Sequence, residues 1–132
     1  MTNSLKIERD GTILKVTFNR PEKKNAIDNP MWVRLRETFI EADADDNVRC
    51  ILLTGAGENF SAGVDLTSFG QSSLGDEHPF ESAARAVADF SKPLIAAVKG
   101  VAVGGGATIL FHADIVYVGK SLRMRLPFAS LA

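Results

Sequence analysis

Three short apolar runs separated by helical stretches constrain the fold of this chain most strongly. The runs are residues 48–54, 94–98 and 115–118. A strand that is apolar at nearly every position is typical of a parallel sheet covered on both faces. Good helix formers at residues 83–90 and a helical stretch at residues 107–111 separate these runs. The order strand, helix, strand, helix, strand therefore predicts an α/β fold with a mainly parallel sheet.

The N-terminal part of the chain predicts a hairpin followed by a helix. Strands at residues 5–9 and 13–18 flank a glycine turn, and the polar, proline-containing segment 20–26 that follows is expected to be a loop. A helix is predicted with Asn29 as its N-cap and Pro30 in its first position. The apolar side of this helix is predicted to consist of Met31, Val33, Leu35, Phe39 and Ile40. Trp32 is expected at the margin of that side.

Two glycine-rich turns are the main candidates for a functional site. The segments 60–66 and 100–106 each lie between an apolar run and a helical stretch. If the two turns face each other, their backbone N–H groups form an oxyanion hole, which suits a thioester carbonyl that becomes an enolate. A glycine cluster that opens a helix also favours an anionic oxygen near Gly105. The alternative is that Gly104 and Gly106 serve only close packing between strand and helix.

Other catalytic patterns fit the sequence poorly. The glycines of 100–106 lack the spacing of nucleotide-binding loops, and Ser61 lacks the setting of a hydrolase nucleophile. No His/Cys cluster has metal-ligand spacing, so no metal site is expected. His78 and His112 are expected to be structural, the first in a loop and the second at a helix end. No glutamate or histidine stands where a base is expected beside the two turns.

The segment after the first turn is expected to form a short capped helix and then a loop. Asp65 is predicted to cap a short helix at residues 66–69 through its side chain. Residues 68–79 lack periodicity and are expected to form a mobile loop that covers a ligand.

Composition and charge limit which partners the chain can bind and where in the cell it is expected. The chain has 132 residues, 45% of them hydrophobic, and a formal net charge of −1. This balance fits one domain without a general attraction to nucleic acid or to an anionic membrane. Cys50 is the single cysteine and is expected to be a buried, inert thiol. The N-terminus lacks the apolar core of a signal peptide, and no apolar run is long enough to span a membrane. A cytoplasmic location is expected, with a peroxisomal address at a C-terminus beyond residue 132 left open.

Four motifs together resemble one known family. The segments 19–26, 60–66, 100–106 and 114–117 resemble, in order and in spacing, the crotonase superfamily of enoyl-CoA hydratases and isomerases. The resemblance extends over about residues 5–131, and the four motifs in combination are specific although each alone is not.

This resemblance implies a fold, a ligand and a set of site residues. The implied fold is a spiral of repeated ββα units, with residues 1–132 as the N-terminal core of a single domain and the C-terminal helical trimerisation region absent. The implied ligand is an acyl-CoA thioester, so coenzyme A is part of the substrate and no separate cofactor is expected. A homotrimer or a dimer of trimers is expected for a longer chain. The N–H groups of Val64 and Gly105 are expected to hold the thioester oxygen.

The resemblance also implies contacts along the substrate. Small side chains in the first turn would let a flat ligand lie against the backbone. The basic residues Arg20, Lys23 and Lys24 would meet phosphates of a CoA ligand, the alternative being a solvated loop. The residues expected to bind substrate are Lys23, Lys24, Ala26, Ser61, Ala62, Gly63, Asp65, Leu66 and Gly104.

Two carboxylates of the family's hydratases are missing. Their positions hold Thr108 and Phe128, which argues against water addition because that reaction needs groups that activate water and deliver a proton. Residues 126–131 resemble the Δ3-Δ2 enoyl-CoA isomerase branch, whose catalytic glutamate would fall a few residues beyond Ala132. A truncated enzyme that shifts a C3–C4 double bond to C2–C3 is therefore favoured. A non-catalytic acyl-CoA binder, or another crotonase-type reaction such as thioester hydrolysis or decarboxylation, is the alternative.

Overall fold

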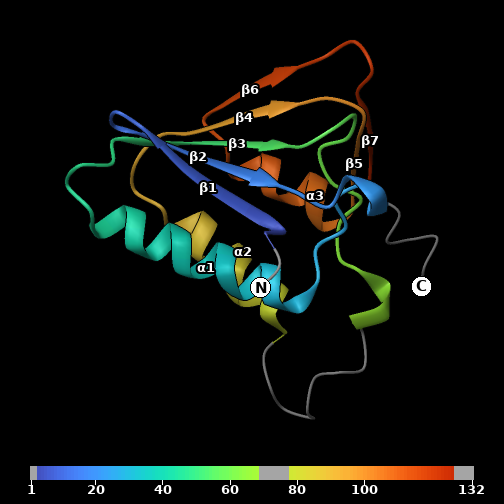
Figure 1. The fold of residues 1–132 in the computed structure, drawn as a ribbon, viewed down its shortest axis with the longest axis horizontal. Helices are drawn as coiled ribbons and strands as arrows, with labels where there is room; N and C mark the ends of the chain where they lie inside the picture. Colours follow the sequence, from blue (N-terminus) through green and yellow to red (C-terminus); the bar gives the residue numbers. More distant parts are fainter. Residues whose placement is uncertain (1–2, 69–77, 127–132) are drawn as a thin grey trace.

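A five-stranded sheet with two long helices on one side organises the chain (Figure 1). The computed structural model describes residues 3–68 and 78–126. Only the first two strands pair antiparallel, and all other neighbours in the sheet are parallel. The mainly parallel α/β prediction is therefore confirmed. Across the sheet the strands are β1 (Leu5–Asp10), β2 (Ile13–Phe18), β3 (Cys50–Gly55), β4 (Leu94–Val98) and β6 (Ile115–Val118).

The helices α1 (Asn29–Ala44) and α2 (Pro79–Asp89) lie side by side along the sheet (Figure 1). The ring of Phe39 from α1 meets that of Phe90, just after α2, edge to face at a centroid distance of 5.2 Å. Burial of apolar side chains from helices and sheet is the main force that holds these layers together. Fully buried members of the core include Val16, Phe18, Leu35, Ile51, Leu53 and Leu94.

The register of the sheet brings several loops to one edge. Phe18 of β2 pairs with Gly55 of β3, so these parallel strands end at the same level. The loops that follow them, and the glycine turn after β4, leave the sheet at its carboxyl edge, which is where open α/β folds usually bind ligands. The smaller elements beyond this edge are η1 (Pro21–Lys23), η2 (Leu66–Ser68), β5 (Val101–Val103), α3 (Gly105–Thr108), η3 (Ile109–His112) and β7 (Arg123–Arg125).

Several predicted boundaries were wrong for identifiable reasons. The N-cap of α1 is Asp28, not Asn29, because the Asp28 carboxylate accepts a hydrogen bond from the Met31 N–H at 3.0 Å. The next helix starts earlier than predicted, at Pro79, where the imidazole of His78 caps it by accepting from the Phe80 N–H at 3.0 Å.

The glycine segment 100–106 is more than a turn. Val101–Val103 forms β5, a short strand parallel to β7, and the helix that follows starts at Gly105 rather than at residue 107. Strand pairing therefore takes up three of the seven residues of a segment whose glycine content suggested only a turn.

Burial also differs from prediction at single positions. Trp32 is fully buried instead of marginal, whereas Val33 and Ile40 are 43% and 48% exposed on α1. Cys50 is only partly buried. The last strand of the sheet, β6, is exposed at all four of its residues, although its apolar sequence predicted a covered strand. Among the described elements, β6 packs mainly against β4, its one neighbour in the sheet (Figure 1), so its side chains are left uncovered.

Lys92 ties the end of α1 to the beginning of β3. Its ammonium group donates to three backbone carbonyls, those of Ala42 at 2.8 Å and of Asp45 and Val48 at 2.7 Å. These carbonyls belong to the end of α1 and the turn behind it, where a cation is favoured by the helix dipole.

We expect Lys92→Met to lower the free energy of unfolding by about 2 kcal/mol, since hydrogen bonds made by a charged group are worth more than neutral ones. Urea unfolding followed by circular dichroism measures the effect. The exposed Lys120→Met serves as the matched control, with an expected change below about 0.5 kcal/mol. Equal stability of the two variants would show that the three contacts contribute little.

The exposed edge strand β6 predicts self-association of the 132-residue polypeptide, because an apolar strand with an unpaired edge is a template for another chain. Tyr117 in this strand is 64% exposed, so a lysine there costs little packing. We expect Tyr117→Lys to reduce association in sedimentation velocity, while Ile40→Lys, a similar change on α1, leaves it unchanged. Association of Tyr117→Lys at the level of the parent chain would exclude β6 as the contact.

Candidate functional site

The loop after β2 is shaped by a buried asparagine. Lys24 and Asn25 both adopt left-handed backbone conformations, with φ of 52° and 58°, which asparagine tolerates better than most residues. The Asn25 side chain is fully buried, donates to the carbonyls of Ala56 and Asn59 at 2.9 and 2.7 Å, and accepts from the Arg20 N–H at 2.8 Å. This locks the loop onto the segment after β3 and leaves Lys23 and Lys24 exposed.

The same loop pairs with the first glycine-rich turn. The Ile27 N–H donates to the Gly63 carbonyl at 2.8 Å, and the Asp65 N–H donates to the Ile27 carbonyl at 2.9 Å. These two bonds form a parallel bridge between Ile27 and Val64. In such a bridge the residue that lies between the two bonded ones, here Val64 between Gly63 and Asp65, directs its own N–H and C=O away from the partner strand. The Val64 N–H therefore points away from Ile27.

The second glycine-rich turn packs directly against the first. Ser61 forms a parallel bridge with Ala102 of β5, and the Val103 N–H donates to the Ser61 carbonyl at 3.0 Å. A Cβ atom added to Gly63 would collide with the Val103 carbonyl and would lie 3.2 Å from the Gly105 nitrogen. Only glycine permits this approach of backbone to backbone. The structure thus brings the two predicted turns together.

The two N–H groups singled out by the sequence have no acceptor in the described part of the chain. Neither the Val64 nor the Gly105 N–H donates a hydrogen bond within residues 3–68 and 78–126. Gly105 is buried, and an added Cβ would lie 3.0 Å from the Phe80 ring and 3.4 Å from Trp32. These two rings pack edge to face with their centroids 4.9 Å apart. The Gly105 nitrogen therefore lies beside Gly63, the residue before Val64, and next to an aromatic pair.

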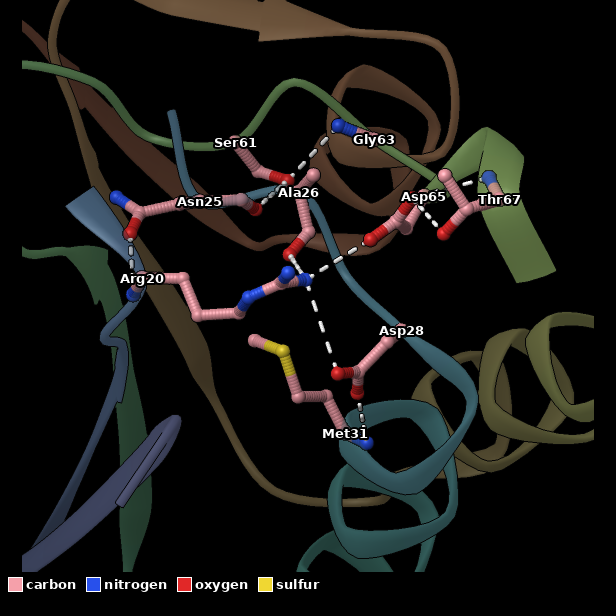
Figure 2. Close-up of polar contacts among 9 residues, drawn as sticks. All are labelled: Arg20, Asn25, Ala26, Asp28, Met31, Ser61, Gly63, Asp65 and Thr67. Carbon is pink, nitrogen blue, oxygen red and sulfur yellow. Dashed lines mark hydrogen bonds and ion pairs between the residues drawn. The ribbon is translucent and has the colours of Figure 1, made fainter. Parts of the chain in front are cut away.

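An ion-pair cluster links the loop, the first turn and α1 (Figure 2). One guanidinium nitrogen of Arg20 lies 2.9 Å from the Ala26 carbonyl, 3.1 Å from the Asp65 carboxylate and 3.7 Å from that of Asp28. The Arg20 and Asp65 side chains are both only 17% exposed. The expectation that Arg20 meets ligand phosphates with Lys23 and Lys24 is thus not supported, because the guanidinium is turned inward.

Asp65 fulfils its predicted capping role. Its second carboxylate oxygen accepts from the Thr67 hydroxyl at 2.8 Å and from the Thr67 N–H at 3.0 Å, at the start of η2. Hydrogen bonds from the Thr67 hydroxyl and N–H, and then from Arg20, hold the pKa of the Asp65 carboxyl below its usual value. The group is therefore ionised at neutral pH.

The remaining predicted substrate-binding residues differ in accessibility. Ser61 is fully buried, and its hydroxyl donates to the Asn25 carbonyl at 2.8 Å and accepts from the Gly63 N–H at 3.0 Å. Leu66 is 63% exposed, and Ala26 and Ala62 are partly exposed. Gly104 has a positive φ of 58° and directs its N–H to the Arg125 carbonyl. Contact of these residues with a ligand stays a prediction.

Of the two positions where hydratases carry carboxylates, the structure describes only Thr108. The Thr108 hydroxyl donates to the Gly104 carbonyl at 3.0 Å, one helical turn earlier. Phe128 lies outside the described residues, as does most of the predicted mobile loop at 68–79. His112 ends η3 as predicted.

The part of the chain that the structure describes holds neither a candidate metal site nor a membrane-spanning helix. Residues 3–68 and 78–126 contain no group of three or more His, Cys, Asp or Glu side chains arranged to hold a metal ion. Among the helices within the same ranges, none has the length and apolar character required to cross a membrane.

Sequence reasoning proposed Arg20 as a phosphate contact and missed its inward ion pair with Asp65, and it missed the buried, loop-shaping role of Asn25. Asn25 carried a usable signal, because an asparagine in a polar loop after a strand is a good candidate for a left-handed conformation. Arg20 carried none, since its partner Asp65 is 45 residues away in the sequence.

Comparison with known proteins places this arrangement in a family. The chain is 39% identical to enoyl-CoA delta isomerase 2 of Rattus norvegicus over 132 residues, which cover 95% of this chain and 34% of that protein. It is also 39% identical to enoyl-CoA hydratase EchA19 of Mycobacterium tuberculosis over 124 residues, which cover 89% of this chain and 47% of the relative.

A solved structure shows the same fold. OdaA of Pseudomonas aeruginosa superposes with a TM-score of 0.91 at 39% identity, covering 98% of this chain and 53% of that one. The chain spans about half the length, or less, of the relatives it matches. The sequence model described as enoyl-CoA hydratase/isomerase matches residues 8–131. The chain therefore belongs to the enoyl-CoA hydratase/isomerase family, and its fold is the crotonase-like α/β fold.

Proposed function

We propose that these residues form the thioester-binding core of an isomerase that shifts a C3–C4 double bond of an enoyl-CoA to C2–C3. The observation that carries the proposal is the contact between the two glycine-rich turns, with Gly63 against the Gly105 nitrogen and the Val64 N–H directed away from Ile27. Two donors fixed by backbone pairing are suited to an oxygen that gains charge, because they need no rearrangement during reaction.

The chemistry proceeds through a dienolate. A carboxylate base removes a proton from C2, the electrons pass into the thioester carbonyl, and the same proton is returned at C4 as the double bond moves. The Val64 and Gly105 N–H groups would hold the oxygen throughout, and one such donor is worth about 3 kcal/mol of barrier. The partly exposed Phe80 ring beside Gly105, backed by the fully buried Trp32, would exclude water from the acyl group.

The base is assigned to a glutamate beyond residue 132. Thr108 supports this, because its hydroxyl bonds to the Gly104 carbonyl and a threonine supplies no carboxylate for water activation. The length of the relatives, about twice that of this chain in most cases, is consistent with a base contributed from further along.

The coenzyme A moiety would lie along the exposed surface of the loop and the first turn. Lys23 and Lys24 are exposed cations on that loop and would face its phosphates. Ala26, Ala62 and Leu66 offer small or apolar exposed surface next to them. Coenzyme A enters as part of the substrate, so the proposal requires no further cofactor.

A non-catalytic acyl-CoA binder is the second candidate, favoured by Thr108 in place of a carboxylate. It shares the oxyanion site but predicts binding without turnover. A hydratase activity is supported by the relative EchA19, which is as similar to this chain as the delta isomerase is, at 39% identity. Thr108 argues against this activity, because it supplies no carboxylate.

The reaction assignment predicts that the natural full-length polypeptide converts 3-hexenoyl-CoA to 2-hexenoyl-CoA and hydrates crotonyl-CoA at least about a hundredfold more slowly, as expected for loss of acid–base catalysis. Absorbance at the conjugated thioester band and product chromatography measure both. Fast hydration without isomerisation would overturn the assignment. Tight binding of both thioesters with neither reaction would favour the binder.

The oxyanion geometry predicts that Gly105→Ala lowers the isomerisation rate about tenfold to a hundredfold, since the new methyl must displace Phe80 or move the N–H. Adding Phe80→Leu to Gly105→Ala should restore part of the rate by making room. Gly11→Ala is the control, because Gly11 lies in the β1–β2 turn with open space around the added methyl; its φ of 60° makes alanine there cost stability, while the rate of the folded enzyme should stay unchanged. A Gly105→Ala enzyme with the parent rate would exclude this N–H from the site.

A further inference from the structure

The position of Val64 depends on how the loop 20–28 is held against the first turn. Besides the two Ile27 bonds, the Ala62 N–H donates to the Lys24 carbonyl at 2.9 Å and the Ser61 hydroxyl donates to the Asn25 carbonyl at 2.8 Å. Every one of these bonds joins one of the two segments to the other. If the loop shifts, the Val64 N–H shifts with it.

Arg20 connects both segments at the end of this ladder. Its side chain reaches across from the loop so that one nitrogen contacts the Ala26 carbonyl in the loop and the Asp65 carboxylate in the turn (Figure 2). Arg20 is itself fixed, because its N–H donates to the buried Asn25 side chain and its carbonyl accepts from Lys23 and Asn25, both at 2.9 Å. Because its backbone is fixed, Arg20 can hold Asp65, the residue next to Val64, in one position.

Charge makes this contact difficult to replace. Asp28 caps α1 and Asp65 caps η2, and both carboxylates lie within 4 Å of the same guanidinium nitrogen. Without Arg20, two partly buried carboxylates would lie near each other without this counter-charge, and their repulsion would act directly on the turn. A lysine supplies the charge but not the planar set of donors.

We propose that Arg20 is a positioning residue that acts through Asp65 to fix the Val64 N–H for the thioester oxygen. The inference rests on the proposed function, because it assigns to Arg20 the alignment of one of the two proposed donors. It does not place Arg20 in contact with substrate.

The test is the infrared carbonyl stretch of butanoyl-CoA labelled with ¹³C at the thioester carbon, bound to the natural full-length polypeptide. Hydrogen bonds from a fixed oxyanion hole lower this frequency. We expect Arg20→Met to reduce the shift to less than half of the parent value and Arg20→Lys to give an intermediate shift. The matched control is Arg9→Met, which breaks another Arg–Asp pair, with Asp45, on the surface away from the site. Its shift should equal that of the parent.

Turnover separates positioning from stability. Arg20→Met should lower kcat for the 3-enoyl thioester about tenfold to a hundredfold, as a misplaced donor does, with KM changed less than about threefold. A merely structural role would lower the melting temperature and leave both the carbonyl shift and kcat of the folded protein unchanged. Should Arg20→Met not fold, Arg20→Lys and Asp65→Asn carry the same test.

The outcomes distinguish this inference from the proposed function. A parent protein that gives no carbonyl shift, or that does not bind the thioester, would contradict the proposed oxyanion site and the role of Arg20 with it. A clear parent shift that persists unchanged in Arg20→Met would overturn the role of Arg20 and leave the proposed function standing.

Discussion

Backbone contact between the two glycine-rich turns is the constraint on which the rest of the site depends. Gly63 lies so close to the Val103 carbonyl and the Gly105 nitrogen that no side chain fits between them. The register of the parallel strands brings both turns to the same edge of the sheet, and the Asn25 loop holds the first turn from the other side. The Val64 and Gly105 N–H groups are therefore placed largely by main-chain pairing.

Much of this arrangement could be predicted from the sequence because its determinants are local. Apolar runs marked the parallel strands, glycine marked the two turns, and Asp65 was recognised as a cap from its place before a short helix. The family was recognised from the order and spacing of four motifs, and the comparisons confirm it. The roles of Val64 and Gly105 in the reaction stay predictions.

What the sequence could not show depends on distant partners. Arg20 turns inward only because Asp65, 45 residues later, lies beside it. The exposure of β6 arises because, among the described elements, it packs mainly against β4 alone, which its apolar sequence does not indicate. Trp32 is buried because Phe80 and Gly105 pack against it from other elements. In each case tertiary neighbours decided a property that local pattern alone left undetermined.

The most direct test of the central claim is the amide ¹H chemical shift of Val64 and Gly105 in the natural full-length polypeptide as butanoyl-CoA is added, with free coenzyme A as the reference ligand. We predict that both amide protons move downfield with the thioester and not with coenzyme A, since only the thioester supplies the carbonyl oxygen. Unchanged shifts at both residues while the thioester is bound would contradict the account.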